Sequence, residues 1–348
     1  MKADWTKYTL NFRKPAGTSR GVLMDKYSYF ISLEQGDRSG LGECGILKGL
    51  SADDRPEYED RIQELCADIS KGQDPYQILD SLDEWPSLQA GLEMALLDLK
   101  AEGHILYPSE FTEGLERQPI NGLIWMADKA EMLQQVRERI DKGFLVLKMK
   151  IGAIDLESEL EILTEIRKEY GPHEIQLRVD ANGAFNAEEA PKILERLDKL
   201  RIHSIEQPLK PGNVEAMAAL CAKGILPIAL DEELIGVFDK EKKQDLLDTI
   251  KPQFIILKPS FLGGFTKSEE WIDMAERRGI GWWVTSALES NYGLSAIAQW
   301  NYTLYGYLAS GLGTGSLYTN NLDSPLQQVR GTIAYNPEGN WDLSSLNL

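Results

Sequence analysis

The fold is indicated by residues 144–182, which read FLVLKMKIGAIDLESELEILTEIRKEYGPHEIQLRVDAN. The apolar runs Phe144–Lys150 and Ile175–Asp180 have the length and composition of buried β-strands. Between them, Leu156–Glu169 places apolar residues at spacings of three and four, which is typical of an amphipathic helix. Two strands joined by a helix form a β-α-β unit, which predicts neighbouring parallel strands.

The same alternation continues along the chain from about Pro119 onward. The strands recur roughly every 25–30 residues, the length of one strand-plus-helix unit, and Ala187–Leu200 is a further helical pattern. The predicted strands are Ile120–Trp125, Phe144–Lys150, Ile175–Asp180, Ile202–Glu206, Leu226–Asp231, Phe254–Lys258, Gly281–Ser286 and Tyr305–Leu312. Strands alternating with helices in this number predict an α/β fold, a (β/α)₈ barrel of the TIM type.

The first part of the chain has a different pattern. The segments Tyr8–Phe12, Ser28–Leu33 and Arg38–Glu43 are strand-like, whereas Pro56–Ile69 and Leu88–Ala101 are helical. We therefore predict an N-terminal α+β capping domain over residues 1–115 and a catalytic barrel over residues 116–317. A weak strand at Gln328–Tyr335 suggests that the tail, residues 318–348, packs back on the first domain.

The composition argues against several classes of protein. A net charge of −18 disfavours a nucleic-acid partner, because a polyanion would be repelled. The scattered cysteines Cys44, Cys66 and Cys221 fit a reducing cytoplasm and neither a disulfide framework nor a zinc site. No apolar run approaches the ~20 residues that span a bilayer, and residues 1–12 lack the apolar core of a signal peptide. We expect a cytoplasmic protein with no membrane partner.

Lysines stand at the C-terminal ends of two predicted strands, where a barrel of this type carries its active site. Lys148 and Lys150 are two residues apart on one strand, so both side chains can enter the barrel mouth. Two ammonium groups this close disfavour each other's protonated state, which suits a lysine that acts as a general base. Lys258 ends another strand nearly across the barrel, so a substrate would lie between the lysines.

Three acids, Asp180, Glu206 and Asp231, end three consecutive predicted strands. They would repel one another unless positive charge lies between them. A hard cation with oxygen ligands, most simply Mg²⁺ with Mn²⁺ as a substitute, meets this need. Each acid alone could instead cap the following helix. Asp231 ends its apolar run, but the adjacent Glu232 is an alternative third ligand.

Together these residues resemble the enolase superfamily, in its muconate-lactonizing subgroup. The resemblance is carried, on strands two to six, by Lys148, Lys150, Asp180, Glu206, Asp231 and Lys258. The predicted α+β domain is similar to the capping domain of that superfamily, and Gly91–Asp98 is similar to a helix near its end. The loops Ser286–Ser290 and Gly311–Gly315 look most like those of the o-succinylbenzoate synthases, a family of hydro-lyases in menaquinone biosynthesis.

This resemblance implies a Mg²⁺-dependent syn dehydration of a small anionic carboxylate. The substrate would be a 2-succinyl-6-hydroxy-cyclohexadiene carboxylate and the product o-succinylbenzoate. Mg²⁺, held by the three acids, would bind the substrate carboxylate and stabilise the enediolate. Lys150 would remove the adjacent proton and return it to the departing hydroxyl. Lys258 would stabilise the intermediate by its charge, and Lys148 would support the metal and the carboxylate.

The resemblance also implies substrate contacts around the mouth. Candidates are Ser286, Ser290, Gly311 and Gly313 for the distal succinyl group, Arg178 and Asn182 for orienting substrate or metal, and Arg20 as a lid residue. Ordinary roles compete with these: small residues populate tight loops, and the arginines could serve core packing or lie solvated in a hairpin.

Other functions are compatible with the same residues. An N-acylamino acid racemase uses the same two lysines on opposite faces of the alpha carbon. A dipeptide epimerase is disfavoured, because Gly311-Leu-Gly313 replaces the Asp-x-Asp of that family. From another class, a catalytically silent barrel could act as a binding protein, and a metal titration would distinguish it.

Overall fold

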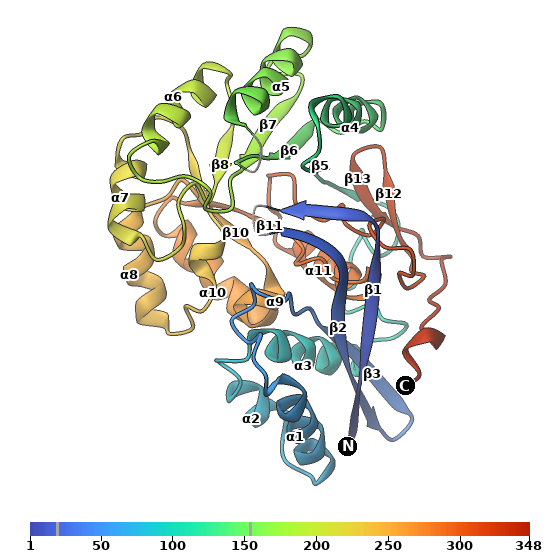
Figure 1. The fold of residues 1–348 in the computed structure, drawn as a ribbon. Coiled ribbons are helices and arrows are strands. Elements are labelled where there is room, and N and C mark those ends of the chain that lie inside the picture. Colours follow the sequence, from blue (N-terminus) through green and yellow to red (C-terminus); the bar gives the residue numbers. More distant parts are fainter. Residues whose placement is uncertain (19–20, 153–154) are drawn as a thin grey trace.

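The computed structural model describes residues 1–18, 21–152 and 155–348. Its centre is a curled sheet of seven strands in the order β11-β10-β9-β8-β7-β6-β5 (Figure 1). Every neighbouring pair in this sheet is parallel. The strands are β5 (Gly122–Ile124), β6 (Val146–Lys150), β7 (Gln176–Asp180), β8 (Ser204–Glu206), β9 (Ile228–Leu230), β10 (Phe254–Leu257) and β11 (Gly281–Val284).

The eighth barrel strand is reduced to two bridged residues. Ser310 forms a parallel bridge with Ile120, and Gly311 forms one with Thr285. The amide of Gly311 donates to the carbonyl of Val284 at 2.8 Å, which closes the sheet on that side. The predicted (β/α)₈ barrel is therefore confirmed, although most of Tyr305–Leu312 is not paired. Tyr305 has a positive φ of 53° and is 88% exposed, which excludes it from a buried strand.

Helices alternate with the barrel strands and pack around them (Figure 1). Asp128, Asp155 and Asp239 precede three of them, and each carboxylate accepts a backbone N–H of the first turn. The helices are α4 (Lys129–Asp141), α5 (Leu156–Glu169), α6 (Ala190–Lys199), α7 (Val214–Ala222), α8 (Lys240–Ile250), α9 (Pro259–Leu262), α10 (Gly264–Glu276) and α11 (Asn291–Thr303), with a 3₁₀ turn η1 (Glu232–Leu234). Among the described residues, no helix is long and apolar enough to span a bilayer.

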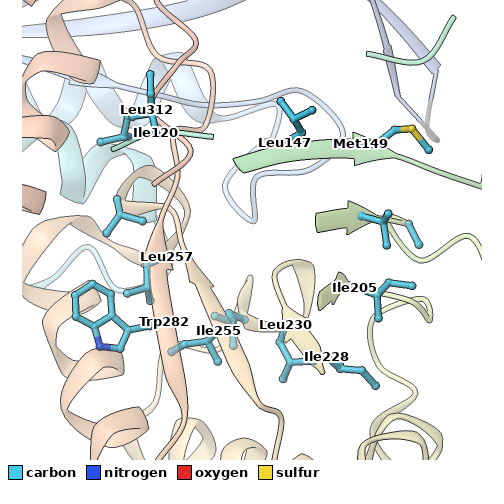
Figure 2. Packing of buried hydrophobic residues seen from close by; sticks show 14 of the residues in the cluster. Ile120, Leu147, Met149, Ile205, Ile228, Leu230, Ile255, Leu257, Trp282 and Leu312 are labelled. Atoms are coloured by element: carbon cyan, nitrogen blue, oxygen red, sulfur yellow. The ribbon is translucent and has the colours of Figure 1, made fainter. Parts of the chain in front are cut away.

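The pleat of β6 separates core residues from functional ones. Leu147 and Met149 are each 1% exposed and belong to the main hydrophobic core. Figure 2 shows the side chains of Leu147 and Met149 on the same side of β6. Because successive side chains on a strand point to opposite faces, Lys148 and Lys150 face the other way. Burial of the apolar pair thus fixes the direction of both lysines.

The N-terminal part is an α+β capping domain, as predicted. An antiparallel sheet of β1 (Lys2–Thr18), β2 (Gly21–Gln35) and β3 (Arg38–Cys44) packs with α1 (Tyr58–Ser70), α2 (Pro75–Asp80) and α3 (Pro86–Asp98). The α3 helix lies so close to β3 that a Cβ added to Gly42 would come within 1.9 Å of the Gly91 carbonyl oxygen. Figure 1 shows the β1–β2 hairpin reaching from this domain toward the barrel sheet.

The C-terminal tail contacts both parts of the molecule. Its strands β12 (Leu326–Val329) and β13 (Thr332–Tyr335) form a small sheet with β4 (Arg117–Pro119). A preceding segment runs along β1, where the amide of Arg13 donates to the carbonyl of Leu317 at 2.8 Å. The Tyr8 hydroxyl donates to the carbonyl of Asn320 at 2.7 Å. A 3₁₀ turn, η2 (Ser344–Leu346), follows near the end of the tail.

A buried carboxylate joins the capping domain to the barrel. Glu43 of β3 is fully buried, and its Oε1 accepts the Ser28 hydroxyl at 2.6 Å and the Ser290 amide at 2.9 Å. Its Oε2 accepts the Ser290 hydroxyl at 2.5 Å and the Gly293 amide at 3.0 Å. Lys26 donates to the same Ser28 hydroxyl at 2.9 Å. The beginning of α11 is thereby tied to β2 and β3.

We expect Glu43→Ala to lower the free energy of unfolding by about 3 kcal/mol or more, because buried donors lose a charged acceptor. Equilibrium urea unfolding measures this change. The control is Glu34→Ala, which removes a glutamate that is 59% exposed and pairs with Lys2 at 3.3 Å. That surface change is expected to stay within about 0.5 kcal/mol. Equal small effects of both substitutions would contradict a stabilising role for Glu43.

Candidate active site

A cavity of about 300 Å³ lies at the C-terminal ends of the barrel strands. Its barrel wall includes Lys148 and Lys150 of β6, Asp180 of β7, and Lys258 directly after β10. The opposite wall comes from two segments of the capping domain, residues 22–23 and 47–50. The cavity therefore lies where a (β/α)₈ barrel carries its chemistry, and the capping domain covers it.

Lysine amines and acid oxygens form an ion-pair network in the barrel mouth. Lys148 Nζ lies 2.9 Å from Asp180 Oδ2 and 2.6 Å from Glu206 Oε1. Lys150 Nζ lies 3.1 Å from the same Asp180 oxygen. On the other side of the mouth, Lys258 pairs with Asp231. The three acids are 1–3% exposed, so these charges are held away from water.

The network shifts the pKa values of its members in opposite directions. Burial, reinforced by the charge of Asp180, raises the pKa of Glu206 to about 8. Burial also opposes ionisation of Asp180, but Lys148 and Lys150 outweigh it and hold the pKa of Asp180 well below its usual range. For Lys148, burial is outweighed by Asp180 and Glu206, which raise its pKa. The expectation that paired lysines disfavour protonation is therefore wrong for Lys148, because the acids are the nearer charges.

Within the described ranges, no three His, Cys, Asp or Glu side chains are already arranged to hold a metal ion. In the mouth, lysine amines contact the acid oxygens that a cation would use. The donor set nevertheless fits a hard cation, because buried carboxylates from adjacent strands offer only oxygen ligands. Burial is the main cause of the raised pKa of Glu206, and the charges of Asp180 and Asp231 add to it. Asp180, Glu206 and Asp231 could hold such a cation if the amines moved aside.

The two candidates for the third ligand have different neighbours. Asp231 pairs with Lys258, and its charge contributes to the raised pKa of Glu206. Glu232 Oε1 accepts the side-chain amide of Asn182 at 2.9 Å. Asn182 in turn accepts Lys150 Nζ at 2.7 Å and has a left-handed φ of 44°. Asp231 thus belongs to the acid cluster, while Glu232 helps to orient Asn182 beside Lys150.

Some predicted substrate contacts line the cavity and others do not. Ser286, Gly311, Gly313 and Asn182 are in its wall, and the Ser286 hydroxyl lies 2.8 Å from that of Thr314. Ser290 is not among the described residues that line it. Its side chain is fully buried, accepts the amide of Tyr292 at 3.1 Å as the cap of α11, and donates to Glu43.

Of the two arginine candidates, Arg178 is not among the residues that line the described cavity. Arg178 is 2% exposed, donates to the carbonyl of Ala309 at 2.9 Å, and lies 4.2 Å from the ring centre of Trp283. Arg178 is two residues before Asp180 on β7, so both side chains are on the inner face of the barrel. Arg178 lies deeper than the acids and is not part of the described cavity wall. Arg20 lies outside the described residues.

Several cavity residues have no sequence pattern that marks them. They include Lys48 and Leu50 of the capping domain, Asn121 beside β5, and Leu288 after β11. Leu288 has a left-handed φ of 62°, and its carbonyl accepts the Tyr318 hydroxyl at 2.7 Å. These residues lie on loops, whose side chains follow neither the two-residue repeat of a strand nor the 3.6-residue repeat of a helix.

Comparison with known proteins agrees with this architecture. The family described as "Enolase C-terminal domain-like" matches residues 131–337. The o-succinylbenzoate synthase of Desulfotalea psychrophila is 44% identical over 365 aligned residues, which cover 96% of this chain and 98% of that protein. The N-succinylamino acid racemase of Thermus thermophilus is 32% identical over 295 residues, 79% of this chain and 75% of that protein.

A solved structure gives the same result. The crystal structure of MenC from Desulfotalea psychrophila superposes with a TM-score of 0.86 and 38% identity, covering 96% of this chain and 99% of that one. The similarity therefore includes the capping domain, the barrel and most of the tail. The chain belongs to the enolase superfamily and, within it, to the o-succinylbenzoate synthase family.

Proposed function

We propose that this chain is a carbon–oxygen hydro-lyase that dehydrates a 2-succinyl-6-hydroxy-cyclohexadiene carboxylate to o-succinylbenzoate, a step of menaquinone biosynthesis. The observation that carries this proposal is the 44% identity to an o-succinylbenzoate synthase along nearly the whole chain. The cavity supports it, because two lysines of β6, an acid of β7 and a lysine at the end of β10 converge there. We further propose that the protein is cytoplasmic. We also propose that the capping domain covers residues 1–115 and the catalytic barrel covers residues 116–317.

We propose Mg²⁺ as the cofactor, held by Asp180, Glu206 and Asp231, with Mn²⁺ as a substitute. The support is the buried, oxygen-only donor set on adjacent strands. When bound, the cation would supply positive charge beside the substrate carboxylate, where negative charge accumulates as the adjacent carbon loses its proton.

The chain's own residues would carry the proton. Lys150, in its neutral form, would remove the proton from the carbon next to the carboxylate. The same amine would then donate this proton to the hydroxyl on the same face, so that the C–O bond breaks, a C=C bond forms and water leaves. Asn182 would orient Lys150, whose Nζ it contacts at 2.7 Å. Lys258, across the cavity, would stay charged and stabilise the anionic intermediate, and Lys148 would hold the acids in place.

Racemisation of N-acylamino acids is a second candidate activity. Two observations favour it: lysines stand on both β6 and the end of β10 in one cavity, and the 32% identical relative is an N-succinylamino acid racemase. Racemisation needs a base on each face of the alpha carbon, whereas the syn dehydration needs only Lys150. One active site could therefore perform both reactions.

The proposal is tested by an absorbance assay for o-succinylbenzoate formation. Purified protein is mixed with the cyclohexadiene carboxylate in the presence and absence of Mg²⁺. We expect rapid formation of the aromatic product with the metal and none above background without it. Rapid racemisation of N-succinylamino acids with no detectable dehydration would make the racemase the correct assignment. No reaction with either substrate, despite metal binding, would favour a silent binding protein.

A further inference from the structure

The described cavity wall is positively charged although the whole chain carries −18. Its cationic members are Lys48, Lys148, Lys150 and Lys258, and its acidic member is Asp180. The three barrel lysines are each paired with an acid of the mouth. Lys48 is the exception and comes from the capping domain.

The side chain of Lys48 is exposed and, in the part of the chain that the structure describes, makes no hydrogen bond or ion pair. The other capping-domain residues in the wall of the active-site cavity carry no charge: they are Val22, Leu23, Leu47, Gly49 and Leu50. On the active-site side, an ammonium on this apolar rim is a local source of positive potential. The loop that carries Lys48 is fixed by a hydrogen bond of 2.7 Å from the Gly49 amide to Asp54 Oδ2.

The proposed substrate has two carboxylates at opposite ends. The ring carboxylate belongs beside the catalytic lysines and acids, because the proton to be removed is on the adjacent carbon. The succinyl arm then occupies the rest of the cavity, which Ser286, Gly311 and Gly313 line on the barrel side and residues 22–23 and 47–50 line on the capping-domain side. Its terminal carboxylate needs a cationic partner when it leaves water, since an unpaired charge is costly to desolvate. Lys48 is the described lining cation that the catalytic network does not use.

We propose that Lys48 recognises the distal carboxylate of the succinyl arm and makes the site selective for dicarboxylates. The inference rests on the proposed function. A neighbouring cavity of about 390 Å³ in the capping domain shares Lys48, Val22, Leu23 and Leu47 with the active-site cavity. Lys48 thus stands at the boundary between the two cavities. Arg55 lines the neighbouring cavity only, so it provides a matched control.

Calorimetric titration of the Mg²⁺-loaded protein tests this role without relying on turnover. The two ligands are o-succinylbenzoate and 2-butanoylbenzoate, which keeps the arm but lacks its terminal carboxylate. We expect the wild type to bind o-succinylbenzoate at least about tenfold more tightly. Lys48→Met keeps the alkyl stem but removes the charge. In this variant the ratio of the two affinities should fall toward one, because o-succinylbenzoate binds more weakly while the binding of 2-butanoylbenzoate is unchanged. Lys48→Arg should restore the ratio, and Arg55→Ala should leave it unchanged.

Three results would overturn the inference, and they differ from failure of the proposed function. If the ratio is intact in Lys48→Met, another group recognises the distal carboxylate. If it falls in Arg55→Ala and not in Lys48→Met, the arm enters the neighbouring cavity. A wild-type ratio near one, with normal dehydration, would mean that the distal carboxylate is not selected. Failure of the proposed function would show separately, as absence of dehydration and of any binding of o-succinylbenzoate.

Discussion

Replacing Lys150 by alanine is expected to lower kcat for dehydration by about 10⁴-fold or more, because one amine performs both proton transfers and each such transfer contributes about 10²–10⁴-fold. Lys150 lines the cavity and contacts Asn182 at 2.7 Å and Asp180 at 3.1 Å. Steady-state rates of o-succinylbenzoate formation measure the loss. Mg²⁺ affinity and thermal stability should change little, which separates a lost base from a damaged site. Near-wild-type kcat in this variant would remove Lys150 as the base.

Arginine substitutions provide the matched control for this assignment. Lys150→Arg keeps the positive charge but should be inactive, because arginine does not give up a proton near neutral pH. Lys258→Arg should retain measurable dehydration wherever the larger guanidinium fits, since Lys258 is required there only for its charge. Racemisation should be lost in both. Solvent deuterium exchange into a single enantiomer of an N-succinylamino acid by the Lys258 variant would support this division, and exchange with inversion intact would contradict it.

The barrel could be predicted from the sequence because its strands are buried on both faces. Phe254–Leu257, which forms β10, is apolar over its whole length, and Leu177–Asp180 of β7 is buried throughout although it includes Arg178 and Asp180. The eighth strand could not be placed as well, because Ser310 and Gly311 pair for only two residues and the aromatic residues before them face solvent. The short α2 helix is not marked by a repeating apolar pattern, although Pro75 after the capping Asp74 is a typical helix start.

The catalytic candidates were predictable because strand ends place them. Lys148, Lys150, Asp180 and Lys258 follow directly from where an apolar run stops, and all four line one cavity. Loop residues gave no such signal. A serine at the start of a helix is typical of an N-cap, and Ser290 caps α11 in this way, a role that its loop position alone does not reveal. Lys48 stands in a capping-domain loop, and only the folded chain brings it to the barrel mouth.

Removing the metal is expected to abolish dehydration, and this is the second large effect. Calorimetry should detect one Mg²⁺ or Mn²⁺ per chain, and exhaustive chelation should reduce turnover to background. Glu206→Ala should weaken binding by at least about 100-fold, since even partners of metal ligands cost about 10–100-fold. A surface control, Glu34→Ala, should bind the metal normally. Full turnover after chelation would rule out the metal-dependent mechanism.

The pH dependence of metal binding tests the same cluster from another direction. Burial and Asp180 raise the pKa of Glu206 to about 8 in the metal-free protein, so near neutral pH this carboxyl is largely protonated. A cation must displace that proton, because a ligand carboxylate is ionised. The metal-free state therefore binds more protons, and metal affinity should rise with pH until about 8 and then level off. Titrations in buffers of different ionisation enthalpy should show proton release at pH 7, and its absence would contradict this assignment.

The same titration separates Asp231 from Glu232 as the third ligand. Asp231→Asn should weaken metal binding about as strongly as Glu206→Ala, because Asp231 belongs to the acid cluster and contributes to the raised pKa of Glu206. It should also reduce the proton release near pH 7, since one of the charges that raise the pKa of Glu206 is gone. Glu232→Gln should instead leave both quantities close to wild type and lower kcat modestly, because Glu232 holds Asn182 at 2.9 Å beside Lys150. If Glu232→Gln weakens metal binding strongly and Asp231→Asn does not, Glu232 is the third ligand and Asp231 only pairs with Lys258.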